Sequence, residues 1–216
     1  MEEKGLRTAQ FISFEGIDGC GKSTLMEHLS RWLADAGIAH LRTREPGGSR
    51  LGEKIRGLLL DPANKQMDRR TEVLLYTASR AQLVHECILP AMERGEWVLT
   101  DRYIDATLAY QGFGRGLEIE PLRRIQMWAT GGLQPHRTIL LDCEADLAHG
   151  RMQGRGEHPD RMELESLAFH RRVRNGYLEL ARADRERFIV LDAAKPLDDV
   201  VADFHARFWQ PWLDWE

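Results

Sequence analysis

A glycine-rich segment near the start of the chain has the residue types and spacing to hold phosphate groups. Residues 16–23 read Gly-Ile-Asp-Gly-Cys-Gly-Lys-Ser and fit the P-loop pattern G-x-x-x-x-G-K-S. Glycines let backbone N–H groups curl around phosphate oxygens, and the helix expected after the loop adds the positive end of its dipole. A chance glycine-rich turn is the alternative, but the apolar run before the segment and the helical pattern after it argue against chance. The residues expected to bind the phosphates of a nucleoside triphosphate are Gly16, Asp18, Gly19, Cys20, Gly21, Lys22, Ser23 and Thr24.

Four polar residues are candidates for the chemistry at this loop. Lys22 is expected to reach the β- and γ-phosphates, and the hydroxyl group of Ser23 is expected to ligate Mg²⁺. Asp101 ends a short apolar run, where P-loop enzymes usually place a second carboxylate near Mg²⁺ or a catalytic arginine. Arg102 follows it and offers the planar pair of donors that clamps a phosphate. We therefore expect Mg²⁺ as the cofactor, with catalytic roles for Lys22, Asp101 and Arg102.

A tyrosine and an arginine further along the chain could recognise a nucleobase. Tyr76 and Arg80 are four residues apart and so share one face of the helix expected there. The aromatic ring can stack on a base, while the guanidinium group donates to a base carbonyl. By itself this pair is more typical of a packed tyrosine beside a solvated arginine.

A basic, glycine-containing segment precedes the last long helical pattern. It contains Arg151, Arg155 and Arg161. One interpretation is a solvated loop. The other is a lid over residues 150–162 that brings cations to a phosphoryl group in transfer, since that reaction depends on positioning and charge.

The pattern of apolar runs predicts the fold class. Five short apolar strands alternate with helices, which predicts an α/β fold with a five-stranded parallel sheet and helices on both faces. Ligands of such sheets bind beyond the carboxyl ends of the strands, where Gly16, Arg44 and Asp101 follow strand ends. Residues 70–94 form one long helix or two, with Pro90 at the kink. No linker composition divides the chain, so residues 1–216 are expected to form a single domain. The predicted strands are 11–16, 39–43, 97–100, 138–141 and 188–191.

Composition excludes several classes of protein. The net charge of −4 argues against a general nucleic-acid or membrane-surface binder. The sequence has no run of 18 apolar residues, and its first ten residues are polar, unlike a signal peptide. Its three cysteines form no C-x-x-C pair, so neither a zinc site nor a disulfide framework is indicated. These features predict a cytoplasmic protein with small-molecule partners.

Together, these segments resemble thymidylate kinases, the enzymes that phosphorylate dTMP to dTDP with ATP in dTTP synthesis. The resemblance extends from Phe11 to about Ala183, and the combination of motifs is much more specific than any one of them. It rests on E-G-x-D-G-x-G-K-S at 15–23, R-E-P-G-G at 44–48, Tyr76 with Arg80, D-R-Y at 101–103, A-Y-Q-G-x-G-R-G at 109–116, and the arginine-rich segment 151–161.

The resemblance implies a nucleoside monophosphate kinase fold, ATP and dTMP as substrates, Mg²⁺ and a homodimer. It implies that Arg102 holds the dTMP phosphate, that Arg80 reads the base, and that Tyr110 lies under the deoxyribose and disfavours ribose. The implied dTMP-binding residues are Asp18, Arg44, Tyr76, Arg80, Arg102, Thr107, Tyr110 and Gln111.

The lid also fits one branch of the family. Some thymidylate kinases carry an arginine directly after the P-loop acid, but here that position is Gly19. The resemblance is then to the bacterial type, in which lid arginines supply the cation for the transition state. Arg155, which has glycines on both sides, is the first choice, Arg151 is the second, and Arg161 is left to anchor the lid.

Two departures from the family pattern concern base choice. Tyr76 stands where the family has phenylalanine, and Ala106 stands where many relatives have serine. They leave open a related deoxynucleoside monophosphate kinase with another base specificity. A P-loop regulatory ATPase is an alternative from another class of protein. Such a protein would need a basic surface or a coiled-coil segment to bind its partner, and the sequence indicates neither.

Overall fold

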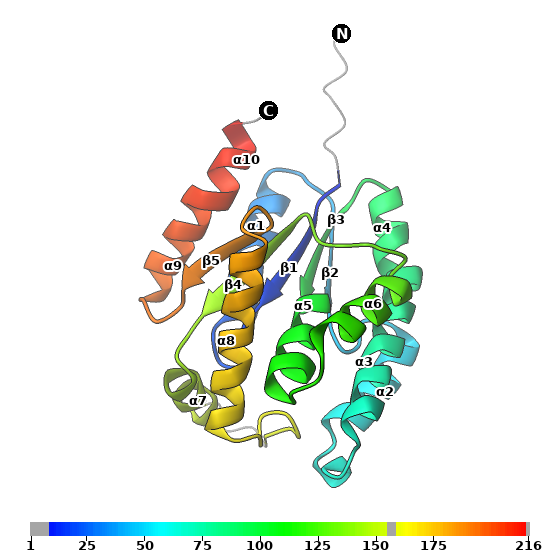
Figure 1. Cartoon of the computed structure of the whole chain (residues 1–216). Coiled ribbons are helices and arrows are strands. Elements are labelled where there is room, and N and C mark those ends of the chain that lie inside the picture. Colours follow the sequence, from blue (N-terminus) through cyan, green and yellow to red (C-terminus); the bar gives the residue numbers. More distant parts are fainter. Residues whose placement is uncertain (1–8, 155–158, 215–216) are drawn as a thin grey trace.

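The five predicted strands form one parallel sheet. The computed structural model describes residues 9–154 and 159–214 of the chain (Figure 1). The strands lie in the order β2-β3-β1-β4-β5, and every neighbouring pair is parallel. Their bounds confirm the prediction to within two residues: β1 Phe11–Glu15, β2 His40–Arg44, β3 Trp97–Asp101, β4 Arg137–Asp142 and β5 Phe188–Asp192.

The strand order explains why the site forms at the end of β1. This strand is fully buried in the middle of the sheet, between β3 and β4. The chain builds the sheet first on the β2 side and then on the β4 side, so the order reverses next to β1. Such a switch point leaves a crevice beyond the carboxyl ends of the strands. These ends point toward the lower side of Figure 1.

Helices cover both faces of the sheet, as predicted. On one face, the first helix packs on the C-terminal helices, where Trp32 stacks on Phe204 with 5.6 Å between ring centroids. On the other face, Tyr110 lies edge-on to Phe169 and Tyr177. The first layer contains α1 Lys22–Asp35, α9 Leu197–Phe204, η4 His205–Trp209 and α10 Gln210–Asp214, and the second contains α5 Ile104–Thr107, η3 Leu108–Gly114 and α8 Leu167–Ala183.

Further helices pack beside the β2 edge and over the P-loop. Ser49 and Asp68 start two of them by accepting from the backbone N–H groups of Gly52 and Arg70. These elements are α2 Arg50–Leu60, η1 Pro62–Asn64, α3 Arg69–Leu83, α6 Ile119–Ala129 and α7 Ala145–Gln153. In the described part of the chain, no helix is both long enough and apolar enough to cross a membrane.

A π-helical turn precedes Pro90 in the helix that contains it. The helix continues from α3 through one π-helical segment, η2 Val84–Ile88, into α4 Leu89–Glu93. Proline lacks the N–H group of a regular helical bond and its ring crowds the preceding turn, and a π-helical turn accommodates both defects. The structure thus has a widened turn just before Pro90, within one continuous helical run.

Candidate active site

The P-loop follows β1 directly and needs its glycines for two reasons. Gly16 has a φ of 135°, and a Cβ at this position would lie 2.6 Å from the carbonyl oxygen of Leu141. Gly21 has a φ of 101° and provides the N-cap of α1 without a side-chain bond, so the first N–H groups of the helix remain available for an anion. Ser23 and Thr24 lie exposed at this helix start, and Cys20 is buried inside the loop.

Lys22 lies across the loop. Its Nζ donates to the carbonyl oxygens of Gly16 and Ile17, both at 3.2 Å, and lies 3.9 Å from Oδ1 of Asp18. The ammonium group is therefore held where the loop curls, with the Asp18 carboxylate on its other side. This places a cation at the position that the motif predicts for phosphate binding.

Asp18 and Arg102 form the polar centre of the site. Nη2 of Arg102 donates to Oδ1 of Asp18 at 2.6 Å and to the Tyr110 hydroxyl at 3.0 Å, and that hydroxyl donates to Oδ2 of Asp18 at 3.1 Å. Burial raises the pKa of Asp18, but the charges of Arg102 and Lys22 outweigh it and hold this pKa well below its ordinary value. Asp18 is therefore an anion at any working pH, and it orients the guanidinium group of Arg102.

The backbone of Arg102 is strained. Within residues 9–154 and 159–214, it is the one non-glycine residue with a positive φ, 74°. Strain of this kind persists where the surroundings fix the conformation, and it gathers at functional sites. The N–H group of Arg102 donates to the carbonyl oxygen of Phe14 at 3.0 Å, and the next N–H group, of Tyr103, donates to Oε1 of Glu15 at 2.7 Å.

Glu15 supports Arg102 through the side chain as well. Its Oε2 accepts from the Tyr177 hydroxyl at 2.7 Å, and that hydroxyl accepts from Nη1 of Arg102 at 3.3 Å. Burial and the charge of Asp105 raise the pKa of Glu15 to about 8. Sequence reasoning gave Glu15 and Tyr177 no role, because they are 162 residues apart in the chain.

An open cavity lies beside the P-loop and brings together the predicted acceptor residues, except for Arg44. Asp18 and Arg102 form the wall that it shares with the loop, and Ala106 also lines it. We call it the acceptor cavity. Arg56, Asp160 and Met162 line it too and were not predicted; the Asp160-Arg161 pair inside the arginine-rich segment was the available signal.

Arg80 is fixed rigidly in the wall of the acceptor cavity. Only 1% of its surface is exposed. Its Nε donates to Oε2 of Glu45 at 2.6 Å and its Nη2 to the carbonyl oxygen of Tyr103 at 2.9 Å, while Nη1 donates to the side chains of Thr107 and Gln126. Because the protein engages all three nitrogens, a base carbonyl at Arg80 would have to share a hydrogen or displace a partner. Its base-reading role stays a prediction.

The remaining predicted arginines lie farther from this centre. Arg44 is exposed and pairs with Glu53 at 3.2 Å, outside the acceptor cavity. Arg151 is exposed on α7 and donates from Nη1 to the carbonyl oxygen of Ala193 at 2.9 Å. Arg155 lies outside the described residues. Arg161 is buried, and its Nε donates to the carbonyl oxygen of Leu59 at 2.6 Å, as expected of an anchor.

The donor atoms present fit the ligation that Mg²⁺ prefers. Oδ1 of Asp101 is buried and has no hydrogen-bond partner among the described residues, which leaves a carboxylate oxygen at the end of β3. No group of three or more His, Cys, Asp or Glu residues in that part of the chain could hold a metal ion by itself. Mg²⁺ typically takes one or two protein oxygens and completes its shell with phosphates and water. Asp101 and Ser23 therefore match a magnesium site that forms with a nucleotide.

The chain has a P-loop at the switch point of a five-stranded parallel sheet, and the acceptor cavity with Arg102 lies beside this loop. This arrangement defines the chain by fold as a P-loop nucleoside monophosphate kinase. Residues 14–204 match the family model described as thymidylate kinase. The chain belongs to the thymidylate kinase family.

Three curated relatives show the extent of the similarity, and each is called thymidylate kinase. The protein of Deinococcus radiodurans is 52% identical over 196 residues, which cover 91% of this chain and 94% of that protein. The protein of Carboxydothermus hydrogenoformans is 47% identical over 88% of this chain and 92% of its own. The protein of Symbiobacterium thermophilum is 47% identical over 89% of each chain. The resemblance inferred from the motifs is thus confirmed over nearly the whole sequence.

Proposed function

We propose that this chain transfers the γ-phosphoryl group of ATP to the phosphate of dTMP, giving ADP and dTDP. One observation carries the proposal. Asp18 belongs to the P-loop, lies 3.9 Å from Nζ of Lys22, and also lines the acceptor cavity. A triphosphate in the loop and a monophosphate in the cavity would therefore meet at the Asp18–Arg102 pair.

The chain's own residues act by positioning and charge. The Lys22 ammonium group binds the terminal phosphates of ATP. The guanidinium group of Arg102 holds the phosphate of dTMP with its two terminal nitrogens, and the phosphate shares or displaces the acceptors that these nitrogens now have within the protein. Asp18 keeps Arg102 in place and offsets part of the positive charge when the cavity is empty of phosphate. Because Asp18 is always ionised, it accepts hydrogen bonds and does not supply a proton.

We further propose that Mg²⁺ binds with ATP through the Ser23 hydroxyl and the Asp101 carboxylate. When bound, it supplies positive charge to the β- and γ-phosphates. Arg151 is proposed to provide a further cation from α7 once its bond to the carbonyl oxygen of Ala193 is released. The same nitrogen also donates weakly to Sγ of Cys143 at 4.0 Å, and the loss of the carbonyl bond costs about 1 kcal/mol.

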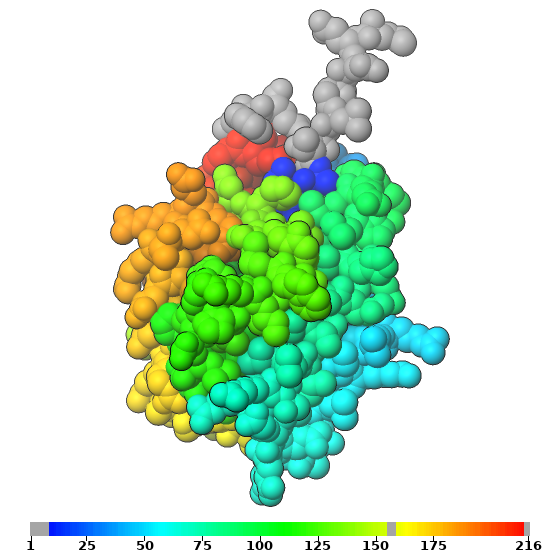
Figure 2. Space-filling model, turned by 45° about the vertical axis from the view of Figure 1, so that its right-hand side comes forward, coloured from blue at the N-terminus to red at the C-terminus, as the bar shows by residue number. Residues whose placement is uncertain are grey.

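We propose that the protein acts as a homodimer. Four large apolar side chains lie exposed on helices that pack against each other: Leu51, at 47%, and Leu58 on α2, Leu74 on α3, and Trp128, at 83%, on α6. These helices, cyan and green, form one side of the molecule in Figure 2. Large apolar side chains exposed on neighbouring helices favour a protein contact on this side. Leu58→Glu should shift the sedimentation coefficient to that of a monomer, and a monomeric wild type would refute the proposal.

The cytoplasm is the proposed compartment. Cys20, Cys87 and Cys143 are free thiols, which fits a reducing environment.

The test of the activity is ADP release from the purified protein with ATP and Mg²⁺, measured without an acceptor and with dTMP, dUMP, dCMP or UMP. ADP should form rapidly only with dTMP or a close deoxy analogue. A kinase of altered base choice would prefer another monophosphate, while a regulatory ATPase would release ADP at the same rate without any. Either outcome would overturn the proposal.

A further inference from the structure

A buried glutamate beside the acceptor cavity has no part in the chemistry described so far. Glu72 lies in the first turn of α3, one helical turn before Tyr76, and is only 1% exposed. Its carboxylate accepts hydrogen bonds from three side chains. Oε1 accepts from Nε2 of Gln111 at 2.8 Å, and Oε2 accepts from Nη1 of Arg161 at 2.5 Å. Arg115 donates to both oxygens, at 3.2 and 3.1 Å.

The surroundings keep this carboxylate ionised. Burial raises the pKa of Glu72, but the bonds from Arg115 and Gln111 and the charges of Arg115 and Arg161 outweigh it and lower this pKa below its ordinary value. An ionised carboxylate can only accept hydrogen bonds. Its neighbours must therefore turn donors toward it.

This requirement fixes the amide group of Gln111. An amide has a donor end and an acceptor end on the same carbon atom, and the reverse orientation would set its carbonyl oxygen against the carboxylate of Glu72. With Nε2 held by Glu72, the carbonyl oxygen Oε1 is turned away from Glu72. Gln111 lines the acceptor cavity and Glu72 does not, so Oε1 is the end of the amide that is turned toward a ligand there.

We infer that Glu72 is a positioning residue that determines base specificity, because it holds Gln111 with its carbonyl oxygen toward the acceptor cavity and so selects bases that present an N–H group. The inference rests on the proposed function and deepens it. Thymine carries a hydrogen on N3, which an amide carbonyl can accept. Cytosine has a lone pair at N3, which would face the lone pairs of Oε1. A mismatch of this kind at a buried polar group favours dTMP over dCMP by roughly 10- to 100-fold.

The Glu72→Gln variant gives the sharpest test because it should invert the amide of Gln111. At residue 72, the end that faces Nη2 of Arg115 and Nη1 of Arg161 must be the amide oxygen, since both partners are cationic donors. The new NH₂ group then faces Gln111 and the Nε–H group of Arg115, and because Arg115 can only donate, Gln111 is the neighbour that must supply an acceptor. Gln111 must turn its own oxygen toward residue 72 and its NH₂ group toward the cavity. The kcat/KM for dTMP should fall and that for dCMP should rise, so that their ratio drops at least about 10-fold.

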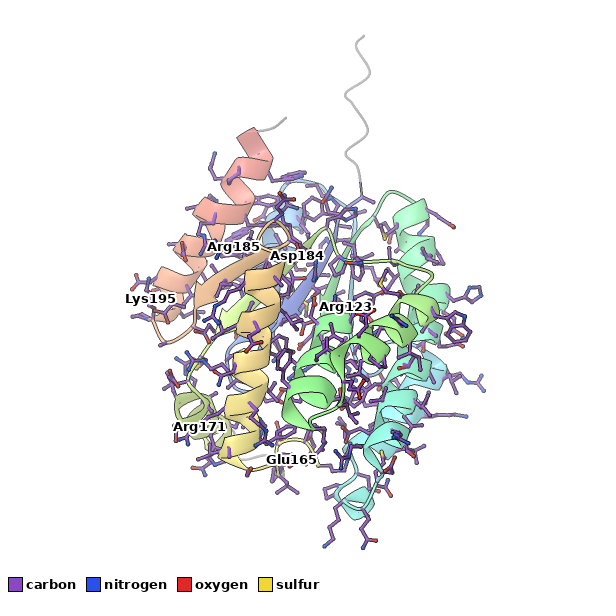
Figure 3. All side chains as sticks on the ribbon, viewed as in Figure 1. Arg123, Glu165, Arg171, Asp184, Arg185 and Lys195 are labelled. Atoms are coloured by element: carbon purple, nitrogen blue, oxygen red, sulfur yellow. The ribbon has the colours of Figure 1, made fainter. Side chains whose placement is uncertain are left out.

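Glu165→Gln is the matched control. Glu165 accepts a hydrogen bond from Nη1 of Arg115 at 2.5 Å, so it belongs to the same charge cluster. It has no hydrogen bond to Gln111 and does not line the acceptor cavity. It precedes α8 by two residues and is labelled near the lower end of that helix in Figure 3. This variant should keep the dTMP to dCMP ratio of the wild type. If Glu72 only anchors Arg161, Glu72→Gln will lower kcat/KM for both nucleotides equally, and an unchanged ratio overturns the inference.

If circular dichroism shows that the Glu72→Gln protein is unfolded, two further measurements still test the inference. Gln111→Met removes the amide and should lower the dTMP to dCMP ratio roughly 10-fold, and a wild-type ratio in this variant overturns the inference. The wild type should also reject dTMP methylated on N3, and full activity with this analogue would likewise overturn the inference. A wild type inactive on dTMP would instead refute the proposed function, so the two failures are distinguishable.

Discussion

Replacing the buried Glu15 by glutamine should stabilise the protein in a way that depends on pH. Glu15 has no exposed surface, and burial with the charge of Asp105 raises its pKa from the ordinary 4.5 to about 8. The folded protein therefore holds this carboxyl group protonated over a range in which the unfolded chain releases the proton. By linkage, the difference costs the folded state about 5 kcal/mol once the pH reaches 8.

The direction follows from proton counting. Between pH 4.5 and 8 the unfolded state binds fewer protons at this position than the folded state, so the stability of the wild type falls as the pH rises. Glutamine does not titrate, and its amide can still accept from the N–H group of Tyr103 while its NH₂ group faces the Tyr177 oxygen. That hydroxyl loses its acceptor, at a cost of about 1–3 kcal/mol. Glu15→Gln should therefore be slightly less stable than the wild type at pH 5 and more stable at pH 8.

Thermal unfolding followed by circular dichroism between pH 5 and 9 measures this difference. Between pH 5 and pH 8 the linkage term changes by about 3.5 kcal/mol, because the unfolded chain is already partly ionised at pH 5. A protein of this size gains roughly 2–4 °C in Tm per kcal/mol, so the Tm of the variant relative to the wild type should rise by about 7–14 °C from pH 5 to pH 8 and then level off. Glu53→Gln is the control, because Glu53 is 45% exposed and a bond from the Gly48 N–H group lowers its pKa. If the difference for Glu15→Gln is flat between pH 5 and 8, the carboxyl group is ionised in the folded protein and the reasoning is wrong.

Three substitutions test the proposed roles at the phosphates by steady-state kinetics. Lys22→Met should lower kcat at least about 100-fold with an unchanged circular dichroism spectrum, and more than a tenth of wild-type turnover would contradict the role of Lys22. Arg102→Lys should lower kcat/KM for dTMP about 100-fold, because one ammonium group cannot replace the paired donors that contact Asp18 and Tyr110, and a near-normal value would place the phosphate elsewhere. Arg151→Ala should lower kcat on the order of 10³-fold with little change in the KM for dTMP, and a wild-type kcat would remove Arg151 from the reaction.

The sequence predicts the sheet and the P-loop well because both depend on residues that are close together in the sequence. Each strand is a short apolar run of its own, and the P-loop motif specifies a turn that only glycines at fixed positions allow. Pro90 likewise marks a local change, although the π-helical form of the turn before it was not predicted.

The supporting residues could not be predicted in the same way. Glu72 contacts Gln111 and Arg161, which lie 39 and 89 residues away, and no periodicity or motif connects them. The π-helical segment η3 is similar, since a Cβ at Gly114 would lie 2.7 Å from the Phe169 ring on α8. Its shape thus depends on a helix that comes more than 50 residues later. Local sequence patterns identify the candidate ligand-binding residues, while the residues that orient them depend on tertiary packing.

Tertiary packing also explains why a glycine follows the P-loop acid Asp18. Gly19 has a φ of 82°, and a Cβ there would lie 2.3 Å from the carbonyl oxygen of Ala148 on α7. An arginine is therefore excluded at this position by the backbone of α7, and not simply absent from the sequence. The close contact that excludes it also brings α7 against the loop, and Arg151 lies on α7 one turn after Ala148. If Arg151 has the proposed role, the helix whose backbone excludes an arginine from the loop also carries the cation for the reaction.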